Sequence, residues 1–197
     1  MDADELARQS MILTRSFYNR HTIDVARDLL GKIIVHGETA GRIVETEAYL
    51  GGDDLASHSA RGITGRTRVI FGPPGHAYVY FIYGMYECLN LVAEPEGKPG
   101  CVLIRSLEPV AGIEIMQRRR PTARRLRDLA SGPGRLTLAL DITRAQNGAD
   151  VTRGDLVVRK LRNEPKFEIQ VTPRVGISQC ADLLLRYLIA GSEFVSR

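Results

Sequence analysis

The chain has 197 residues, of which 44% are hydrophobic and 25% charged, a composition that fits one globular domain over residues 1–197. No apolar run approaches the roughly 20 residues of a membrane helix, and the acidic first residues lack the apolar segment of a secretory signal, so we expect neither an anchor nor a signal peptide. Cys88, Cys101 and Cys180 are odd in number and lack metal-site spacing, so we expect buried thiols in a reducing compartment.

The net charge of +4 is concentrated in one segment. Residues 115–136 hold seven arginines and one acid, Asp128, for a local charge of +6, whereas the 20 basic and 22 acidic residues elsewhere sum to −2. Localised arginine is typical of a surface that binds a polyanion, most often nucleic acid. A solvated surface that only keeps the protein soluble is the alternative. The candidates for contact with a nucleic-acid backbone are Arg118, Arg119, Arg120, Arg124 and Arg125.

The first half of the chain predicts one helix, two strands and a long loop. The helix begins near Thr22, a suitable N-cap, and ends at the stop signal Gly31. Residues 32–36 and 42–49 predict two strands joined by a turn. Residues 50–70 are polar and glycine-rich without a clear period, and predict an ordered loop with short helical turns.

The second half predicts a hairpin, a further strand and a helix that begins at Pro109 and runs toward Arg119. The expected strands are 77–83, its hairpin partner 88–93 across Gly84, and 101–106, then 155–161 and 168–172; the apolar residues 181–190 should dock on the core. Hairpins mixed with separate helices indicate an α+β fold in a single domain. We expect a mixed, largely antiparallel curved sheet with surrounding helices and a protruding β-hairpin.

Strand 42–49 carries two acids whose surroundings decide their use. Side chains alternate along a strand, so its two faces differ. One face carries Glu45, Glu47 and Tyr49, and the other carries Val44, Thr46 and Ala48. If Val44 and Ala48 face the core, the acids lie either on the wet face of an amphipathic strand or in a pocket, where one carboxylate can be a general base.

Four of the seven tyrosines fall within nine residues, at Tyr78, Tyr80, Tyr83 and Tyr86. Alternation puts Tyr78 and Tyr80 on one face of their strand and Tyr83 on the other, beside Gly84 at the hairpin tip. Either the tip folds back onto the domain, or Tyr83 is exposed as a wedge of the kind that unstacks DNA bases. Packing is the best explanation for Tyr78 and Tyr86.

Long motifs resemble the alkyladenine (3-methyladenine) DNA glycosylase family, in register over roughly residues 10–190. They are RIVETEAYLG at Arg42–Gly51, ASHS at Ala56–Ser59, FGPPGHAYVY at Phe71–Tyr80, YGM at Tyr83–Met85, CLN at Cys88–Asn90 and CVLIRSLEP at Cys101–Pro109. The resemblance implies a monofunctional glycosylase that flips alkylated or otherwise modified purines out of duplex DNA and hydrolyses the N-glycosidic bond in base excision repair. It also implies a fold similar to a terminal domain of methionyl-tRNA formyltransferase.

The resemblance assigns roles to individual residues. Glu47 matches the general base that activates the attacking water, and Arg105 matches a side chain that helps to hold that water. The pocket for the flipped base matches Tyr49, His58, Tyr80 and Asn90, the last of which bears on the purines that are accepted. The intercalating residue matches Tyr83, with Met85 beside it. The products are a free base and an abasic site, without a covalent intermediate.

The chemistry of these residue types agrees with that assignment. A base within a duplex must be extruded, and a damaged base that pairs poorly is extruded at lower cost. An N-alkylated purine is cationic, so it leaves easily and favours an electron-rich cage, here Tyr49, Tyr80 and His58, by about 1–2 kcal/mol when desolvated. A nearby carboxylate can stabilise the oxocarbenium-like sugar while it takes a proton from water.

Simpler interpretations stand beside these assignments. His58 can be an ordinary loop residue, Arg105 can form an ion pair with Glu108, and Asn90 can close the hairpin. Two departures from the family pattern also stand out: Gly65 occupies a position where proline is common, and Glu87 places an acid near the hairpin that should face DNA.

The runner-up function is a non-catalytic nucleic-acid-binding module of the same fold, which would not need Glu47 in its motif. A bifunctional glycosylase with lyase activity needs an amine nucleophile, and no lysine lies in the motifs.

We expect a monomer without metal or cofactor, located with the DNA inside the cell, in a bacterial cytoplasm or nucleoid or in a eukaryotic nucleus. Its substrate is expected to be double-stranded DNA with damaged purines, and the motifs do not choose among 3-methyladenine, 7-methylguanine, hypoxanthine and etheno adducts.

Overall fold

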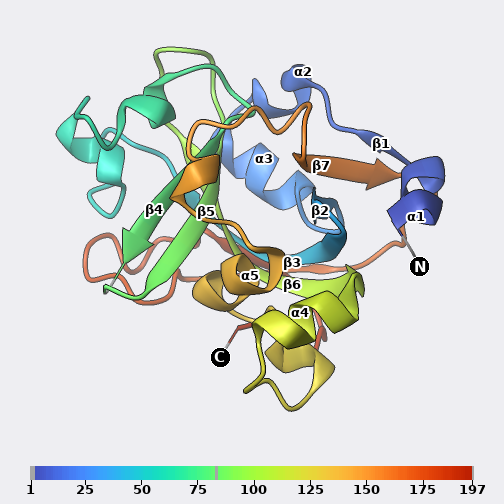
Figure 1. The fold of residues 1–197 in the computed structure, drawn as a ribbon. Coiled ribbons are helices and arrows are strands. Elements are labelled where there is room, and N and C mark those ends of the chain that lie inside the picture. The colour runs from blue at the N-terminus through green and yellow to red at the C-terminus, as the bar shows by residue number, and fades with distance from the viewer. Residues whose placement is uncertain (1–2, 83, 197) are drawn as a thin grey trace.

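A computed structural model describes residues 3–82 and 84–196, which form a nine-stranded sheet flanked by short helices (Figure 1). The strands are β1 (Ser10–Ile12), β2 (Ile33–His36), β3 (Thr39–Tyr49), β4 (Ala77–Ile82), β5 (Tyr86–Val92), β6 (Cys101–Ala111), β7 (Leu156–Leu161), β8 (Ile169–Thr172) and β9 (Arg186–Ile189). The α-helices are α1 (Ala3–Gln9), α2 (Arg15–Tyr18), α3 (Thr22–Asp28), α4 (Ile113–Arg119) and α5 (Pro133–Leu140). The 3₁₀ turns are η1 (His58–Arg61), η2 (Arg68–Phe71), η3 (Leu126–Asp128) and η4 (Arg144–Gln146).

The sheet has the strand order β1-β7-β2-β3-β6-β5-β4, and β9 pairs with both β3 and β8. All of these described strand pairs are antiparallel. Helix α3 packs on β3 and β6, whereas α5 packs on β5 and β6 and also contacts α4. The predicted α+β class and largely antiparallel sheet are confirmed. No helix within the described ranges is long and apolar enough to cross a bilayer.

The N-terminus of α3 is capped by a distant carboxylate. Thr22 was predicted to be the N-cap, but it is the first helical residue. The N-cap is His21, whose side chain forms no capping hydrogen bond. The Glu94 Oε1 atom accepts hydrogen bonds from the Thr22 backbone N–H at 2.8 Å and from its hydroxyl at 3.0 Å. A carboxylate at this end also opposes the positive end of the helix dipole. Because Glu94 is 72 residues away, no local pattern could reveal this cap.

Strand β3 keeps the predicted alternation from Glu45 to Tyr49 but contains an irregularity near Val44. Its register against β6 shifts between Ile43 and Thr46. As a result Ile43 joins Ala48 in the main hydrophobic core, and Val44 does not. Val44 is buried as well, but it lies outside that cluster, because an irregularity in a strand can turn a side chain to the other face.

Strand β6 continues through Pro109, so the prediction of a helix from Pro109 was wrong. Pro109 lies opposite Gly41, next to a register shift, where a strand tolerates a residue without an N–H. The helix begins at Ile113, after Gly112, whose φ of +67° suits glycine. A side chain at Gly112 would collide with the Glu38 carbonyl, so the chain can turn here only with glycine.

The predicted long loop and hairpin are present. Residues 50–70 contain η1 and the start of η2, in agreement with the expected helical turns. Strands β4 and β5 form the hairpin at the edge of the sheet, on the left in Figure 1. Residue Tyr83 at its tip lies outside the described residues.

Two elements of the second half were missed or understated. Helix α5 begins with Pro133 at its first turn, a start signal that the sequence analysis had not identified as one. The predicted docking of residues 181–190 occurs through β9, in which Tyr187 and Leu188 are buried, whereas Leu183 and Leu184 remain exposed.

Candidate active site

A cavity of about 390 Å³ opens between the β4–β5 hairpin, the loop before it and the segment after β8. Its size falls in the range of about 300–1,000 Å³ that is usual for small-molecule sites. It is lined by His58 from η1, by Tyr78, Tyr80 and Ile82 from β4, by Tyr86, Cys88 and Asn90 from β5, by Cys101, Leu103 and Arg105 from β6, and by Tyr49, Pro133, Gly134, Val175 and Ile177. The cavity thus combines flat aromatic walls with few charged groups.

Strand alternation builds this cavity on one face of the sheet. On β6, Leu103 and Arg105 line the cavity while Val102 and Ile104 lie in the core on the opposite face. On β4, Tyr78, Tyr80 and Ile82 line the cavity, in agreement with the prediction that they share one face of the strand. The same alternation therefore separates a dry core from a ligand-sized space.

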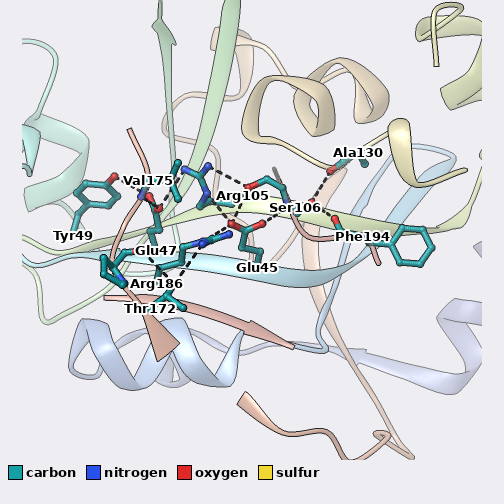
Figure 2. Close-up of polar contacts among 12 residues, drawn as sticks. Glu45, Glu47, Tyr49, Arg105, Ser106, Ala130, Thr172, Val175, Arg186 and Phe194 are labelled. Carbon is teal, nitrogen blue, oxygen red and sulfur yellow. Dashed lines mark hydrogen bonds and ion pairs between the residues drawn. The ribbon is translucent and has the colours of Figure 1, made fainter. Parts of the chain in front are cut away.

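Glu47 lies directly behind the cavity wall, fully buried (Figure 2). Its Oε1 atom accepts a hydrogen bond from the Val175 backbone N–H at 2.8 Å and lies 3.3 Å from Arg105 Nη1. Its Oε2 atom accepts a hydrogen bond from the Tyr49 hydroxyl at 2.9 Å. All three partners line the cavity, so Glu47 is one layer from it. The wet-face interpretation of this strand was wrong, because Glu45 is fully buried as well.

The Tyr49 hydroxyl is held in its protonated form. Burial, together with the negative charge and hydrogen bond of Glu47, raises the pKa of Tyr49 well above its usual value. Tyr49 is therefore a hydrogen-bond donor to Glu47 at every physiological pH, and its ring presents a neutral aromatic face to the cavity.

Arg105 binds two carboxylates, and neither is Glu108. Its Nε donates to Glu45 at 3.0 Å, and its Nη1 faces Glu47. Burial alone would lower the pKa of Arg105, but the charges of Glu47 and Glu45 raise it above the ordinary value. The alternative of an Arg105–Glu108 ion pair was wrong, since Glu108 instead accepts from Arg42 Nε at 2.8 Å.

The aromatic wall is organised by Tyr78, which the sequence analysis had assigned to packing. The Tyr78 hydroxyl accepts a hydrogen bond from Arg66 Nε at 3.2 Å and lies 3.0 Å from His58 Nδ1. If the Tyr78 hydroxyl gives its proton to His58, Nδ1 is the acceptor and the imidazole carries its proton on Nε2, which is the tautomer we expect. The His58 ring meets the Tyr80 ring edge-on, with centroids 4.6 Å apart.

The charge state of His58 follows from the same surroundings. Burial, and after it the positive charge of Arg66, lowers the pKa of His58 to about 4. The ring is therefore neutral at pH 7 and can stack against a base without adding a cation to the cavity. The sequence could have assigned Tyr78 to the cavity, because side chains alternate along β4 and Tyr78 shares a face with Tyr80.

A buried ion pair between Arg174 and Asp54, which no sequence pattern indicated, holds Tyr49 in place. Both terminal nitrogens of Arg174 bind the Asp54 carboxylate at 2.7 Å, and Arg174 Nη1 also donates to the Ala48 carbonyl at 3.0 Å. The guanidinium lies 4.6 Å from the centre of the Tyr49 ring. Asp54 in turn accepts from the Leu50 N–H at 3.0 Å, so the pair binds the backbone on both sides of Tyr49. No sequence signal links two residues 120 positions apart.

The cavity lining includes the amide of Asn90 and the thiols of Cys88 and Cys101. Asn90 Nδ2 donates to the Tyr78 carbonyl at 3.1 Å, so this residue both bridges the hairpin strands and lines the cavity. Burial raises the pKa of Cys88 to about 11 and that of Cys101 to about 12, which keeps both thiols protonated and unreactive at neutral pH. Cys180, expected to be buried, is only half-buried.

The arginine-rich segment, residues 115–136, contributes Pro133 and Gly134 to the cavity lining. A Cβ at Gly134 would lie 2.7 Å from the Tyr86 ring, so glycine lets the hairpin and the start of α5 approach closely. Arg118 and Arg124 are exposed and form no hydrogen bond or ion pair with the part of the chain that is described. The other three predicted backbone contacts have intramolecular partners: Arg119 donates to the Ala139 carbonyl, Arg120 to the Asp128 carbonyl and Arg125 to the Asp128 carboxylate.

The hairpin tip and the two departures from the family pattern can also be placed. Met85 is 61% exposed at the tip, whereas its neighbour Tyr83 is outside the described residues. Glu87 forms an ion pair with Arg144 Nε at 3.1 Å, so its charge is balanced within the protein. A Cβ at Gly65 would meet open space, so no close contact requires glycine there. Among residues 3–82 and 84–196, no three His, Cys, Asp or Glu side chains form a metal-ligand group.

An aromatic cavity beside a buried carboxylate is an arrangement suited to a DNA glycosylase, and comparison with known proteins supports that class. The family model described as "Methylpurine-DNA glycosylase (MPG)" matches residues 16–193. The chain belongs to this family of DNA repair glycosylases.

Relatives agree over nearly the whole length. The chain is 54% identical over 193 residues to a protein of Methanoculleus marisnigri, a match that covers 95% of this chain and 100% of the relative. It is 51% identical over 191 residues to a protein of Koribacter versatilis, covering 93% and 92%, and 48% identical over 190 residues to one of Chlorobaculum tepidum, covering 94% and 90%. Each of the three is named "Putative 3-methyladenine DNA glycosylase".

Proposed function

We propose that the protein is a monofunctional glycosylase that accepts an alkylated or otherwise modified purine, flipped out of duplex DNA, and hydrolyses its N-glycosidic bond. The observation that carries this proposal is the position of Glu47, a buried carboxylate one layer behind an aromatic cavity and bound by three donors that line it. A module that only binds nucleic acid has no use for such a charge, because burying a carboxylate is costly.

The reaction divides between a leaving base and an attacking water. The C1′–N bond breaks with its electron pair going to the purine, which for an N-alkylated base neutralises a positive charge. Water attacks the oxocarbenium-like C1′, and its proton passes to Glu47 Oε2, the oxygen that accepts a hydrogen bond from the Tyr49 hydroxyl. Arg105 Nη1, which lines the same part of the cavity, helps to hold the water. The products are a free base and an abasic sugar.

The remaining roles follow the cavity lining. The flipped base would lie among Tyr49, His58, Tyr80 and Asn90, which all line the cavity. Tyr83 is proposed, from the resemblance, to occupy the gap that the base leaves in the duplex, with the exposed Met85 beside it. No lysine lines the described cavity, which supports hydrolysis without lyase activity because a lyase needs an amine nucleophile.

The decisive test is Glu47→Gln, assayed on duplexes that carry 3-methyladenine, 7-methylguanine, hypoxanthine or an ethenopurine. We expect the single-turnover rate of base release to fall by roughly 100-fold or more, as for loss of a general base, while the affinity for damaged duplex is retained. Near-normal base release by Glu47→Gln would overturn the assignment. A wild-type protein that binds every duplex and releases no base would instead identify a binding module.

DNA contact by the arginine segment has a separate test in the salt dependence of binding. Arg118→Gln combined with Arg124→Gln should flatten the plot of log affinity against log salt by about 0.9 for each phosphate contact that is lost. The matched control is Arg162→Gln, an exposed arginine whose backbone N–H donates to the carbonyl of Gln9 at the end of α1. Helix α1 and the β4–β5 hairpin lie on opposite sides of the molecule in Figure 1. An unchanged slope in the double variant would mean that these arginines face away from DNA.

A further inference from the structure

Glu45, which the sequence analysis left as the structural acid of the pair, binds the same guanidinium as Glu47. Its Oε1 atom accepts from Arg105 Nε at 3.0 Å, from Arg186 Nε at 2.7 Å and from the Ser196 hydroxyl at 2.9 Å. Its Oε2 atom accepts from the Ser196 backbone N–H at 2.6 Å (Figure 2). Glu45 and Glu47 are both fully buried, but all three partners of Glu47 line the cavity, whereas of these partners of Glu45 Arg105 does and Arg186 and Ser196 do not.

The contacts of Arg105 show what Glu45 controls. A guanidinium has an edge formed by Nε and Nη2, and here that edge is occupied by Glu45 at 3.0 Å and by the Ser196 hydroxyl at 3.2 Å. Only Nη1 is left for Glu47, at 3.3 Å, which is longer than the about 2.7–2.9 Å of an optimal charge-assisted contact. Arg105 therefore touches Glu47 through one nitrogen, at the limit of hydrogen-bond distance.

Without that anchor, Arg105 would be free to close onto Glu47. Arginine and carboxylate side chains favour a two-pronged pair in which both carboxylate oxygens accept. Such a pair would engage Glu47 Oε2, the atom needed to take a proton from water, and would neutralise the carboxylate. Glu45 competes for the same guanidinium and so prevents this pairing.

We infer that Glu45, held by Ser196 and Arg186, is a positioning residue that keeps Arg105 from pairing fully with Glu47, so that one Glu47 oxygen and one Arg105 nitrogen remain available to the attacking water. This inference rests on the proposed function. It also makes the segment after β9 part of the active site, since Ser196 supplies two of the donors to Glu45 and the Phe194 carbonyl accepts from the Ser106 hydroxyl next to Arg105.

The first experiment is Glu45→Gln, compared with Glu108→Gln as a matched control. Glu108 also pairs with an arginine, Arg42, across the same two strands, but at their other end and away from the cavity. We expect Glu45→Gln to lower the single-turnover rate of base release by at least about tenfold, as for a displaced catalytic group, and to leave the affinity for damaged duplex unchanged. Glu108→Gln should leave the rate unchanged.

A second readout separates positioning from a general loss of structure. Duplexes with a cationic pyrrolidine abasic analogue and with a neutral tetrahydrofuran analogue report the negative potential at the sugar. If Arg105 closes onto Glu47 in Glu45→Gln, the preference for the cationic analogue should fall while binding of the neutral one is retained. An equal loss of affinity for both would overturn the inference, because a disordered site weakens both.

Ser196→Ala decides the matter if Glu45→Gln does not fold. It removes one hydroxyl that contacts both Glu45 and Arg105 and keeps the backbone donor. It should slow base release severalfold at an unchanged melting temperature, and a wild-type rate would overturn the inference.

If Glu47→Gln is inactive while Glu45→Gln releases base at the wild-type rate, the inference fails and the proposed function stands. If Glu47→Gln is active, the proposed function itself fails.

Discussion

The two sides of the cavity are held in place by different forces. The side that contains Glu47 is held by buried ion pairs: Arg105 joins two carboxylates, and Arg174 joins Asp54 beneath the Tyr49 ring. The other side is held by contacts between neutral groups, with His58 against Tyr80 and hydrogen-bonded to Tyr78. The exposed Arg66 adds a charge there, 4.9 Å from the Tyr80 ring.

This difference suits two separate tasks. Buried charges lose much energy when they are displaced, so the Glu47 side has one arrangement and can hold a water in place. Aromatic rings in edge contact tolerate small shifts, so the Tyr80 side can adapt to modified purines of different shape. We therefore expect substitutions on the first side to affect stability and chemistry, and those on the second to affect the choice of base.

The largest expected effect comes from breaking the buried pair between Arg174 and Asp54. Arg174→Met should lower the free energy of unfolding by about 3–5 kcal/mol, because Asp54 is left buried and unpaired. Urea denaturation measures this loss. The double variant with Asp54→Leu should recover much of it, since an apolar pair of similar volume can replace a buried ion pair. A loss below about 1 kcal/mol in the single variant would mean that the pair is not buried as described.

A smaller effect is expected on the neutral side from Tyr78→Phe. Removal of the hydroxyl takes one hydrogen bond from His58 and should cost about 0.5–1.5 kcal/mol of stability. Nitrogen NMR of the His58 ring should then show both neutral tautomers instead of one protonated on Nε2. Tyr18→Phe is a matched control, because the buried Tyr18 hydroxyl has no hydrogen-bond partner in the described structure, so its loss should not destabilise the protein. Equal effects of the two substitutions would contradict the role given to Tyr78.

The last effect, which has no influence on stability at neutral pH, is the protonation of His58. The ordinary pKa of histidine, 6.5, is lowered in the folded protein to about 4, so between these values the unfolded chain binds more protons at this position. The stabilisation is therefore fully present above pH 6.5 and is lost as the pH falls to about 4. NMR titration of the ring and urea denaturation across this range should show it. His58→Gln should reduce the pH dependence, whereas the same change at the exposed His21 should not.

Local patterns in the chain were sufficient to predict much of the aromatic side of the cavity. The alternation of Tyr78, Tyr80 and Ile82 and the turn after them predicted a hairpin with one aromatic face, because side chains on a strand alternate whatever the strand packs against. Pro109 shows the limit of such patterns. Proline can begin a helix or end a strand pairing, and the position of Gly41 on the neighbouring strand decided between them.

The sequence by itself determined the α+β class, the tyrosine hairpin, the arginine segment and the motif around Glu47, since each depends on residues close together in the chain. Only the tertiary structure decided what surrounds each charge. It joined Glu45 to Ser196, Arg174 to Asp54 and Glu94 to the first turn of α3. The physical reason is that a buried charge must find a partner wherever the fold supplies one, and that choice leaves no periodic trace in the sequence.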